Sequence, residues 1–280
     1  MNSLRQVLSE YKLNHKALPA FNIDSFEIYQ AIEKAVADTN LPCIVQLSAG
    51  EDKFILAERL YLLVKRAQIE GLPIYLNMDH SEDTQRLEHL IKLGFDMVHL
   101  DLSLQDYQTN LNTTAEFIKK IRAINPEAII EAEFNHISLA GSQIDPKSYT
   151  NPTQAKEFID QTQADLLAVS VGNVHGVNQK VPEKLDLNLL KQIRQSLGDA
   201  QYLTLHGGSG VSIDDITSAI NLGIVKININ TDLRLGFKQS LNQNLAQIQS
   251  EKIYELLNPV VEYLENIVKS KLLNFSSANV

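Results

Sequence analysis

The sequence predicts an α/β fold, a (β/α)8 TIM barrel with an added C-terminal helix. Apolar runs of strand length alternate with amphipathic stretches about eight times, which is typical of βαβ units and a parallel sheet. The alternation takes up about 250 of the 280 residues, the size of one such barrel. An open doubly wound sheet would usually show a Gly-rich fingerprint after its first strand, and none is present. We therefore expect residues 1–280 to form a single TIM-barrel domain.

The eight strand candidates are rich in apolar and β-branched residues, and each ends at a polar or Gly-rich break. They cover residues 17–23, 43–49, 74–79, 97–102, 129–134, 166–171, 202–206 and 224–229. Helical periodicity marks the stretches between them. These cover residues 25–40, 54–70, 83–93, 115–124, 153–163, 187–197 and 212–220. After residue 230 the pattern is mostly helical, through 232–247 and 251–273, and the second of these is the added helix.

Composition limits the function classes. With 44% hydrophobic residues the chain can bury a large core, and its formal charge of −9 argues against nucleic-acid binding. The single cysteine, Cys43, lies in an apolar run, where we expect it to be a buried packing residue. One cysteine excludes a disulfide framework, and no stretch reaches membrane-spanning length. We expect a cytoplasmic protein with neither a membrane nor a nucleic acid as partner.

Three histidines, His80, His175 and His206, follow three of the strand-like runs. In a (β/α)8 barrel the active site lies at the C-terminal ends of the strands, so these imidazoles are expected to meet at one rim. Three neutral imidazoles with an open fourth position are typical of a catalytic zinc site. A single histidine at such a place is more often a structural residue. Of the four remaining histidines, we interpret His15, His89 and His99 as structural or solvated.

Carboxylates accompany these histidines. Asp79 directly precedes His80, where it could transfer a proton or could merely orient an imidazole. Asp101 and Glu133, also at strand ends, are candidates to hold imidazole N–H groups or to form an alternate metal position. Lys226 allows two interpretations, a phosphate-facing cation or a Schiff-base nucleophile.

Alternation along the last strand predicts which of its side chains face inward. One parity set is expected to point together into the barrel, and it comprises Lys226, Asn228 and Asn230. The other set is expected to face the helices, and it comprises Val225, Ile227 and Ile229.

The ends of the last two strands predict a phosphate site. Gly207, Gly208 and Ser209 lie in a Gly-rich turn before a helix, whose backbone N–H groups can bind an anion. Asn230 and Thr231 occupy the corresponding place after strand eight. Phosphate sites in these barrels commonly form from these two loops. The alternative is a tight turn in which glycine serves geometry alone.

Taken together, seven motifs resemble those of class II (zinc-dependent) ketose-bisphosphate aldolases, which include the fructose-bisphosphate and tagatose-bisphosphate enzymes. The motifs are Ala20-Phe-Asn22, Val45-Gln-Leu-Ser48, Asp79-His80, Glu131-Ala-Glu133, Val171-Gly-Asn-Val-His175-Gly176, Leu205-His206-Gly-Gly-Ser-Gly210 and Val225-Lys-Ile-Asn228-Ile-Asn-Thr231. They occur in the family's order along nearly the whole chain. The resemblance implies a lyase of carbohydrate metabolism that acts on a sugar phosphate and forms a homodimer or homotetramer.

The resemblance also implies roles for individual residues. His80, His175 and His206 would bind Zn2+, and Asp79 would exchange a proton with the C4 hydroxyl of the substrate. Asn228 would hold the dihydroxyacetone-phosphate portion. The residues expected around its phosphate are Gly176, Gly207, Ser209, Asn230 and Thr231, with Asn22 and Ser48 as further substrate contacts. A monovalent cation, Na+ or K+, would be bordered by Val174, Gly176 and Gly207.

The chain departs from the family pattern in three places. The family's mobile loop carries a glutamate that reprotonates the enediolate, and its position falls near Gly141 here; His136 or Asp145 could take its place. The family also has an Asp-Pro-Arg segment that approaches a neighbouring subunit's substrate, and the corresponding residues here end in Lys252. Finally, Asn230 occupies a position at which the fructose-bisphosphate enzymes often have Asp.

These departures leave two hypotheses. The first is reversible cleavage of a phosphorylated ketose (fructose or tagatose bisphosphate) to dihydroxyacetone phosphate and an aldehyde. The second is a non-catalytic or altered-substrate family member that binds zinc and a sugar phosphate.

Overall fold

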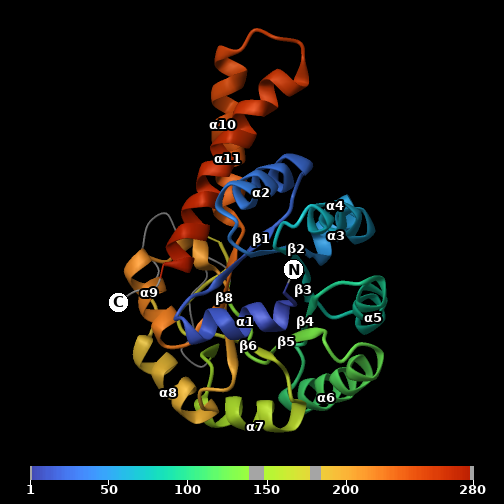
Figure 1. The fold of residues 1–280 in the computed structure, drawn as a ribbon. Coiled ribbons are helices and arrows are strands. Elements are labelled where there is room, and N and C mark those ends of the chain that lie inside the picture. The colour runs from blue at the N-terminus through green and yellow to red at the C-terminus, as the bar shows by residue number, and fades with distance from the viewer. Residues whose placement is uncertain (1, 139–147, 177–183, 278–280) are drawn as a thin grey trace.

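Eight parallel strands form a closed barrel in chain order, with β8 pairing back to β1 (Figure 1). The computed structural model describes residues 2–138, 148–176 and 184–277. The strands are β1 (Leu18–Asn22), β2 (Cys43–Ser48), β3 (Ile74–Ser81), β4 (Met97–Asp101), β5 (Ile129–Glu133), β6 (Leu166–Val169), β7 (Tyr202–Leu205) and β8 (Ile224–Ile229). Each coincides with a predicted run, so the (β/α)8 prediction is confirmed.

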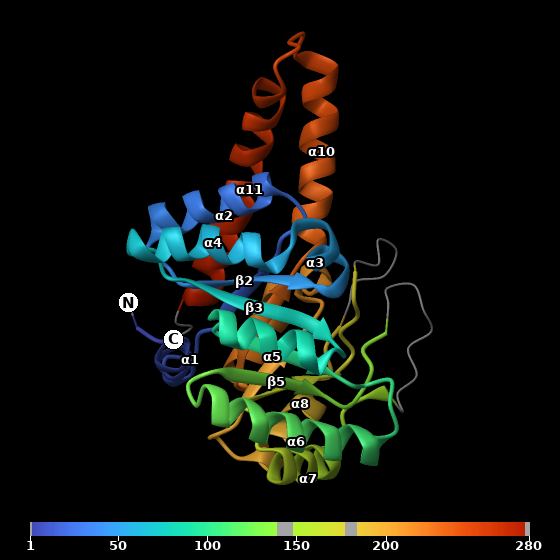
Figure 2. The ribbon, with the colours of Figure 1, turned by 90° about the vertical axis from the view of Figure 1, so that its right-hand side faces the viewer.

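Helices surround the barrel (Figures 1 and 2). They are α1 (Leu4–Leu13), α2 (Phe26–Thr39), α3 (Ala49–Ile55), α4 (Ala57–Ile69), α5 (Thr84–Leu93), α6 (Tyr107–Ile124), α7 (Pro152–Thr162), α8 (Leu187–Leu197), α9 (Ile213–Asn221), α10 (Thr231–Gln247) and α11 (Ile253–Ser276), with a short 3-10 helix η2 (Gly208–Gly210). Most begin at a Ser, Asp or Asn whose side chain accepts a backbone N–H of the first turn, as at Ser25, Asp106 and Ser212.

Helix α1, which the strand pattern did not predict, packs on the N-terminal end of the barrel. Its buried residues are Leu4, Val7, Leu8 and Tyr11. They contact an apolar layer of inward-facing strand residues, which comprises Leu18, Ala20, Ile44, Tyr75, Met97, Ile129, Leu166 and Val225. The barrel interior at this N-terminal end is therefore a packed apolar core, and the polar side chains lie at the C-terminal ends of the strands.

Val225 corrects one expectation, because it belongs to this inner layer and does not face the helices. Leu203 pairs with Ile224 and Thr204 pairs with Lys226, so strand β8 has one extra residue at this point. Such a bulge breaks the alternation of side chains. Beyond it the expected parity holds, with Ile227 in the outer core that the helices cover.

Two helix boundaries also differ from the sequence pattern. The single helix expected over 54–70 is two helices, broken at Leu56, whose φ of 70° cannot continue a helix. The helix expected over 115–124 begins earlier, at Tyr107, after the capping residue Asp106. Two residues on its buried face, Asn110 and Thr114, are polar and hide the helical period there.

Helices α10 and α11 form an arm that projects beyond the barrel and returns to it (Figures 1 and 2). They pack against each other, and α11 also packs on α2. The two helices predicted after residue 230 are therefore confirmed. None of the described helices is long and apolar enough to cross a membrane.

Candidate active site

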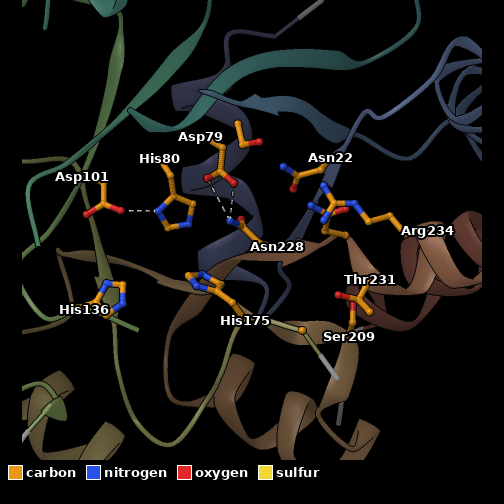
Figure 3. Close-up of a pocket in the computed structure, with 14 residues that line it drawn as sticks. Asn22, Asp79, His80, Asp101, His136, His175, Ser209, Asn228, Thr231 and Arg234 are labelled. Carbon is orange, nitrogen blue, oxygen red and sulfur yellow. Dashed lines mark hydrogen bonds and ion pairs between the residues drawn. The ribbon is translucent and has the colours of Figure 1, made fainter. Parts of the chain in front are cut away.

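A cavity of about 410 Å³ lies at the C-terminal ends of the strands (Figure 3). Most of the residues that line it were predicted as site residues, and these are Asn22, Ser48, Asp79, His80, Asp101, His175, Gly176, Gly207, Ser209, Asn228, Asn230 and Thr231. His136 lines it as well. Three predicted residues, His206, Gly208 and Glu133, lie beneath its surface and are buried. The sequence prediction did not include the remaining lining residue, Arg234.

A bulge in strand β3 explains how two consecutive residues, Asp79 and His80, both line the cavity. Met78 pairs with Val98 and Ser81 with Leu100, so β3 has one residue more than β4 over this stretch. His80 takes up the extra residue with a φ of 47°, in the left-handed region that a non-glycine residue rarely adopts. Backbone strain of this kind is concentrated at functional sites. Without the bulge one of the two side chains would point into the outer core.

The three predicted zinc ligands converge beside Asp79. His80 Nε2 and His206 Nδ1 are 2.8 Å apart, and His175 Nε2 lies 3.4 Å from the same His206 nitrogen. Tetrahedral zinc–nitrogen bonds of about 2.0–2.1 Å place ligand nitrogens about 3.3–3.4 Å apart. The His175–His206 spacing matches this value. A zinc ion on all three would require His80 and His206 to separate slightly and His175 to move towards His80, since the compact donor groups around His80 and His206 do not include His175. The ring of His175 meets that of His80 edge-on, with centroids 4.9 Å apart.

Carboxylates behind the imidazoles fix their orientation. Asp101 Oδ2 lies 2.6 Å from His80 Nδ1, and Glu131 Oε1 lies 2.7 Å from His206 Nε2. In both rings the other nitrogen, His80 Nε2 or His206 Nδ1, is thereby directed towards the point where the three imidazoles meet. Carboxylates commonly orient metal-binding histidines in this way. Glu131 is one of the polar residues at the end of its strand, but the sequence analysis did not predict its contact with His206.

Lys226 matches neither of the two interpretations given to it. Its ammonium is fully buried, 3.0 Å from Glu131 Oε2, and donates to Asn228 Oδ1 at 2.7 Å. It does not line the cavity. Lys226 therefore compensates the charge of Glu131 beneath the site, and a Schiff base at its Nζ would first require this buried ion pair to break.

Burial and neighbouring charges give the three imidazoles different protonation states. Burial, reinforced by the other histidines, lowers the pKa of His175 to about 3 and that of His206 to about 4. Burial also acts to lower the pKa of His80, but Asp79 and Asp101 outweigh it and raise that pKa to about 10. Without a metal, His80 is the charged member and can donate to the neutral His206.

Asp79 is buried and held in its ionised form. Burial alone would raise its pKa, but His80, His99 and Lys226 together hold the pKa well below its usual range. Its Oδ1 accepts the Asn228 amide at 3.2 Å and its Oδ2 accepts the Gln46 amide at 3.1 Å. The carboxylate is therefore positioned, unprotonated, to accept a proton at the cavity wall.

His99, which was expected to be structural or solvated, lies directly beside the predicted zinc ligand His80. It is completely buried, and its ring centroid lies 4.6 Å from that of His80. The backbone N–H of His80 donates to His99 Nδ1 at 3.3 Å, so His99 supports the bulge. Among the described residues two groups could hold a metal ion through clustered donor atoms, one of Asp79, His80, His99 and His206, and one of His80, His99, Asp101 and Glu133.

The predicted phosphate end of the cavity is formed by the loops after β6, β7 and β8. Helix α10 begins at Thr231 without a side-chain cap from Asn230. The Asp232 N–H donates instead to Ser209 Oγ at 3.3 Å, which joins the loop after β7 to the start of this helix. Gly207 has a φ of 69°, and a Cβ there would lie 1.9 Å from the Val174 carbonyl oxygen. Only glycine permits this close approach. Gly208 packs instead against β8, where its Cβ would meet Ile227.

Three residues that were named with the departures from the family pattern do not line the described cavity. Gly141 and Asp145 fall outside the described residues. Lys252 lies in the turn at the far end of the arm, away from the cavity of its own chain, and contacts Glu255 at 3.0 Å. Of the replacements considered for the loop glutamate, His136 alone can be placed, and it lines the cavity near Asp101 (Figure 3).

Comparisons with known proteins agree with this geometry. A family model described as fructose-bisphosphate aldolase class-II matches residues 2–280. The chain is 29% identical to a fructose-bisphosphate aldolase of Staphylococcus aureus, over 99% of this chain and 98% of the relative. It is 30% identical to that of Thermus caldophilus, with 97% of each chain covered. The crystal structure of the YdjI aldolase from Escherichia coli K12 superposes with a TM-score of 0.85 at 26% identity, covering 100% and 99% of the two chains.

Proposed function

Because the chain belongs to the class II fructose-bisphosphate aldolase family, a family of lyases, we propose that it is a zinc-dependent aldolase acting on a phosphorylated ketose. It reversibly forms dihydroxyacetone phosphate and an aldehyde. The observation that carries the proposal is the convergence of His80, His175 and His206 beside an ionised Asp79 in one cavity.

His80, His175 and His206 would hold the zinc, which when bound polarises the ketose carbonyl and stabilises the charge that develops on its oxygen. Asp101 and Glu131 keep two of these imidazoles oriented through their second nitrogens. A monovalent cation, Na+ or K+, is proposed beside Val174, Gly176 and Gly207, where the Val174 carbonyl lies against Gly207.

In the cleavage direction Asp79 takes the proton of the C4 hydroxyl as the C3–C4 bond breaks, and in condensation it returns that proton. The Asn228 amide, which donates to Asp79, lies where it can also contact the dihydroxyacetone portion. Gly176, Gly207, Ser209, Asn230 and Thr231 surround the phosphate, while Asn22 and Ser48 contact the rest of the substrate. We propose His136 as the group that exchanges the proton at C3 of the enediolate, since it lines the same cavity.

Cleavage of fructose and tagatose phosphates by the purified protein, coupled to detection of dihydroxyacetone phosphate, tests the proposal. EDTA should abolish cleavage and added zinc should restore it. Full activity of the metal-free protein would reject the metal mechanism.

The second hypothesis is a family member that binds zinc and a sugar phosphate without turnover. It is favoured by one observation, that the position of the family's loop glutamate falls near Gly141, where this sequence has no glutamate. Multiple-turnover cleavage of any sugar phosphate would exclude it, whereas zinc-dependent binding without products would support it.

We also propose that the protein is cytoplasmic and forms a homodimer or homotetramer. The reduced, buried Cys43 is compatible with a reducing compartment. The arm exposes apolar side chains near its end, including Leu245, Ile253 and Tyr254. Light scattering after size-exclusion chromatography tests the oligomer, and a monomer at micromolar concentration would contradict it.

A further inference from the structure

A cluster of three charged side chains, Asp24, Glu51 and Arg234, adjoins the cavity, and we refer to it as the acidic corner. Arg234 lines the cavity itself, whereas Asp24 and Glu51 line a neighbouring pocket that shares Ser48 and Arg234 with it. Arg234 is the single lysine or arginine among the described residues that line the cavity. Its Nη2 donates to Glu51 Oε1 at 2.7 Å and to Asp24 Oδ1 at 3.0 Å, and its Nε also donates to Asp24. One guanidinium thus serves two carboxylates, so the corner carries no surplus positive charge.

Glu51 is held in this corner by the local fold. It lies in the first turn of α3, where it accepts the Ser48 backbone N–H at 2.7 Å while Ser48 caps the helix. Its carboxylate also accepts the side-chain amides of Asn22 at 2.9 Å and Asn230 at 3.3 Å. With 6% of its surface exposed, Glu51 has little freedom to leave. Burial raises its pKa to about 7, so the corner lies between neutral and singly negative at physiological pH.

The acidic corner lies where the aldehyde half of a ketose substrate would extend, an inference that rests on the proposed function. Ser48 pairs with Asp79 in the barrel register, so the end of β2 is the direct neighbour of the proton acceptor for the C4 hydroxyl. Carbons beyond C4 therefore pass Asp79 towards Ser48 and Asn22. Ser209 and Thr231, which are proposed for the phosphate attached to C1, lie on the β7–β8 side of the cavity, and Glu51 links the two sides because it contacts both Asn22 and Asn230 (Figure 3).

We propose that the aldehyde half is an uncharged hydroxyaldehyde, so that the substrate is a ketose 1-phosphate and not a bisphosphate. A second phosphate in the corner would face Glu51 and Asp24, and like charges placed together oppose binding. Arg234 could bind that phosphate only by leaving both carboxylates without their cation. Hydroxyl groups fit the same corner without this cost, because they can donate to carboxylates and hydrogen-bond to Asn22 and Ser48.

The condensation direction gives a matched test, because one phosphate is the only difference between the two acceptors. Zinc-loaded protein is supplied with dihydroxyacetone phosphate and either D-glyceraldehyde or D-glyceraldehyde 3-phosphate. We expect kcat/KM to be at least about tenfold higher for the uncharged aldehyde, a difference of about 1.4 kcal/mol. A preference for the phosphorylated aldehyde would overturn the inference while leaving the proposed aldolase activity intact.

Replacing Glu51 by glutamine sharpens the test, because glutamine keeps the helix cap and removes the charge. In Glu51→Gln the preference should move about tenfold towards glyceraldehyde 3-phosphate, through a lower KM for that acceptor with little change in kcat. The control Glu116→Gln removes an exposed carboxylate on α6, outside the barrel, and should leave the ratio unchanged. An unaltered ratio in Glu51→Gln would contradict the assigned role of Glu51.

If neither acceptor reacts, the proposed function fails, and binding still decides the charge inference. Calorimetric titration of the zinc-loaded protein with fructose and tagatose 1-phosphates and 1,6-bisphosphates compares the two classes directly. Tighter binding of the 1-phosphates supports an uncharged sugar end, and tighter binding of the bisphosphates overturns it.

Discussion

The two ends of the barrel interior differ in almost every physical respect. At the N-terminal end, α1 and the inner strand residues form an apolar layer with regular packing. At the C-terminal end, buried carboxylates, imidazoles and amides form one connected network around a cavity, and the β3 backbone is bulged at His80. The comparison indicates that the apolar N-terminal end stabilises the fold, whereas the polar C-terminal end contains the catalytic groups. Substitutions at the two ends should therefore affect stability and activity separately.

The largest effect is expected at Asp79, at the centre of the polar end. Asp79→Asn keeps the shape and one of the two accepted amide hydrogen bonds but removes the proton acceptor, so kcat should fall by about 10²–10⁴-fold. Zinc content measured by atomic absorption should stay at the wild-type level. A fall in zinc content equal to the fall in activity would instead make Asp79 a structural support of the metal site.

A smaller effect is expected one step further from the metal, at Glu131. Glu131→Gln leaves His206 with a neutral partner, so zinc affinity should fall by about 10–100-fold. Competition with a chromophoric chelator measures this affinity. Since Lys226 then loses its counter-charge, Glu131→Gln with Lys226→Met provides the matched variant with the buried charge removed. Wild-type zinc affinity in Glu131→Gln would contradict the orienting role.

Zinc affinity should also depend on pH in a defined direction. His80 has a pKa raised to about 10 in the metal-free protein, while His175 and His206 are already neutral at pH 7. Binding must therefore displace one proton, from His80, and the affinity should rise about tenfold per pH unit between pH 6 and 9. Calorimetry in buffers of different ionisation enthalpy counts the released protons, and a count near zero would be inconsistent with this assignment.

The smallest effect on activity is expected from the apolar end. Leu8→Ala removes a fully buried side chain of α1 and should lower the free energy of unfolding by about 2–5 kcal/mol. Activity per folded molecule should be unchanged at 25 °C, because the apolar layer separates α1 from the cavity. Denaturant titration gives the first quantity and steady-state assay the second. A large loss of kcat in the folded variant would mean that the two ends are coupled.

The sequence was sufficient for the barrel and for the strand ends, because buried parallel strands are continuous apolar runs and the fold places polar residues at one rim. The sequence was insufficient to predict side-chain directions where the alternation of inward and outward residues along a strand is interrupted. Periodicity gave no sign of the bulges at His80 and Val225, since an extra residue depends on pairing with a neighbouring strand. Helix α1 was missed although Ser3 and Gln6 form a capping box that the sequence displays.

Two residues beside the site, His99 and Arg234, could have been predicted from sequence patterns that the analysis did not use. His99 shares its strand parity with Asp101, which predicts that both side chains point inward. Arg234 follows Asn230 by one helical turn and so lies on the same helix face. Its pairing with Glu51, distant in sequence, required the closed barrel that brings β8 beside β1.

X-ray absorption spectroscopy of the zinc-loaded protein tests the central claim most directly, because it reports the donor atoms around the ion. We predict three imidazole nitrogens at about 2.0–2.1 Å with a further light donor, and the loss of one imidazole in His206→Ala. A coordination shell with fewer than two imidazoles, or one unchanged by His206→Ala, would contradict the assignment of His80, His175 and His206 as the ligands of one ion.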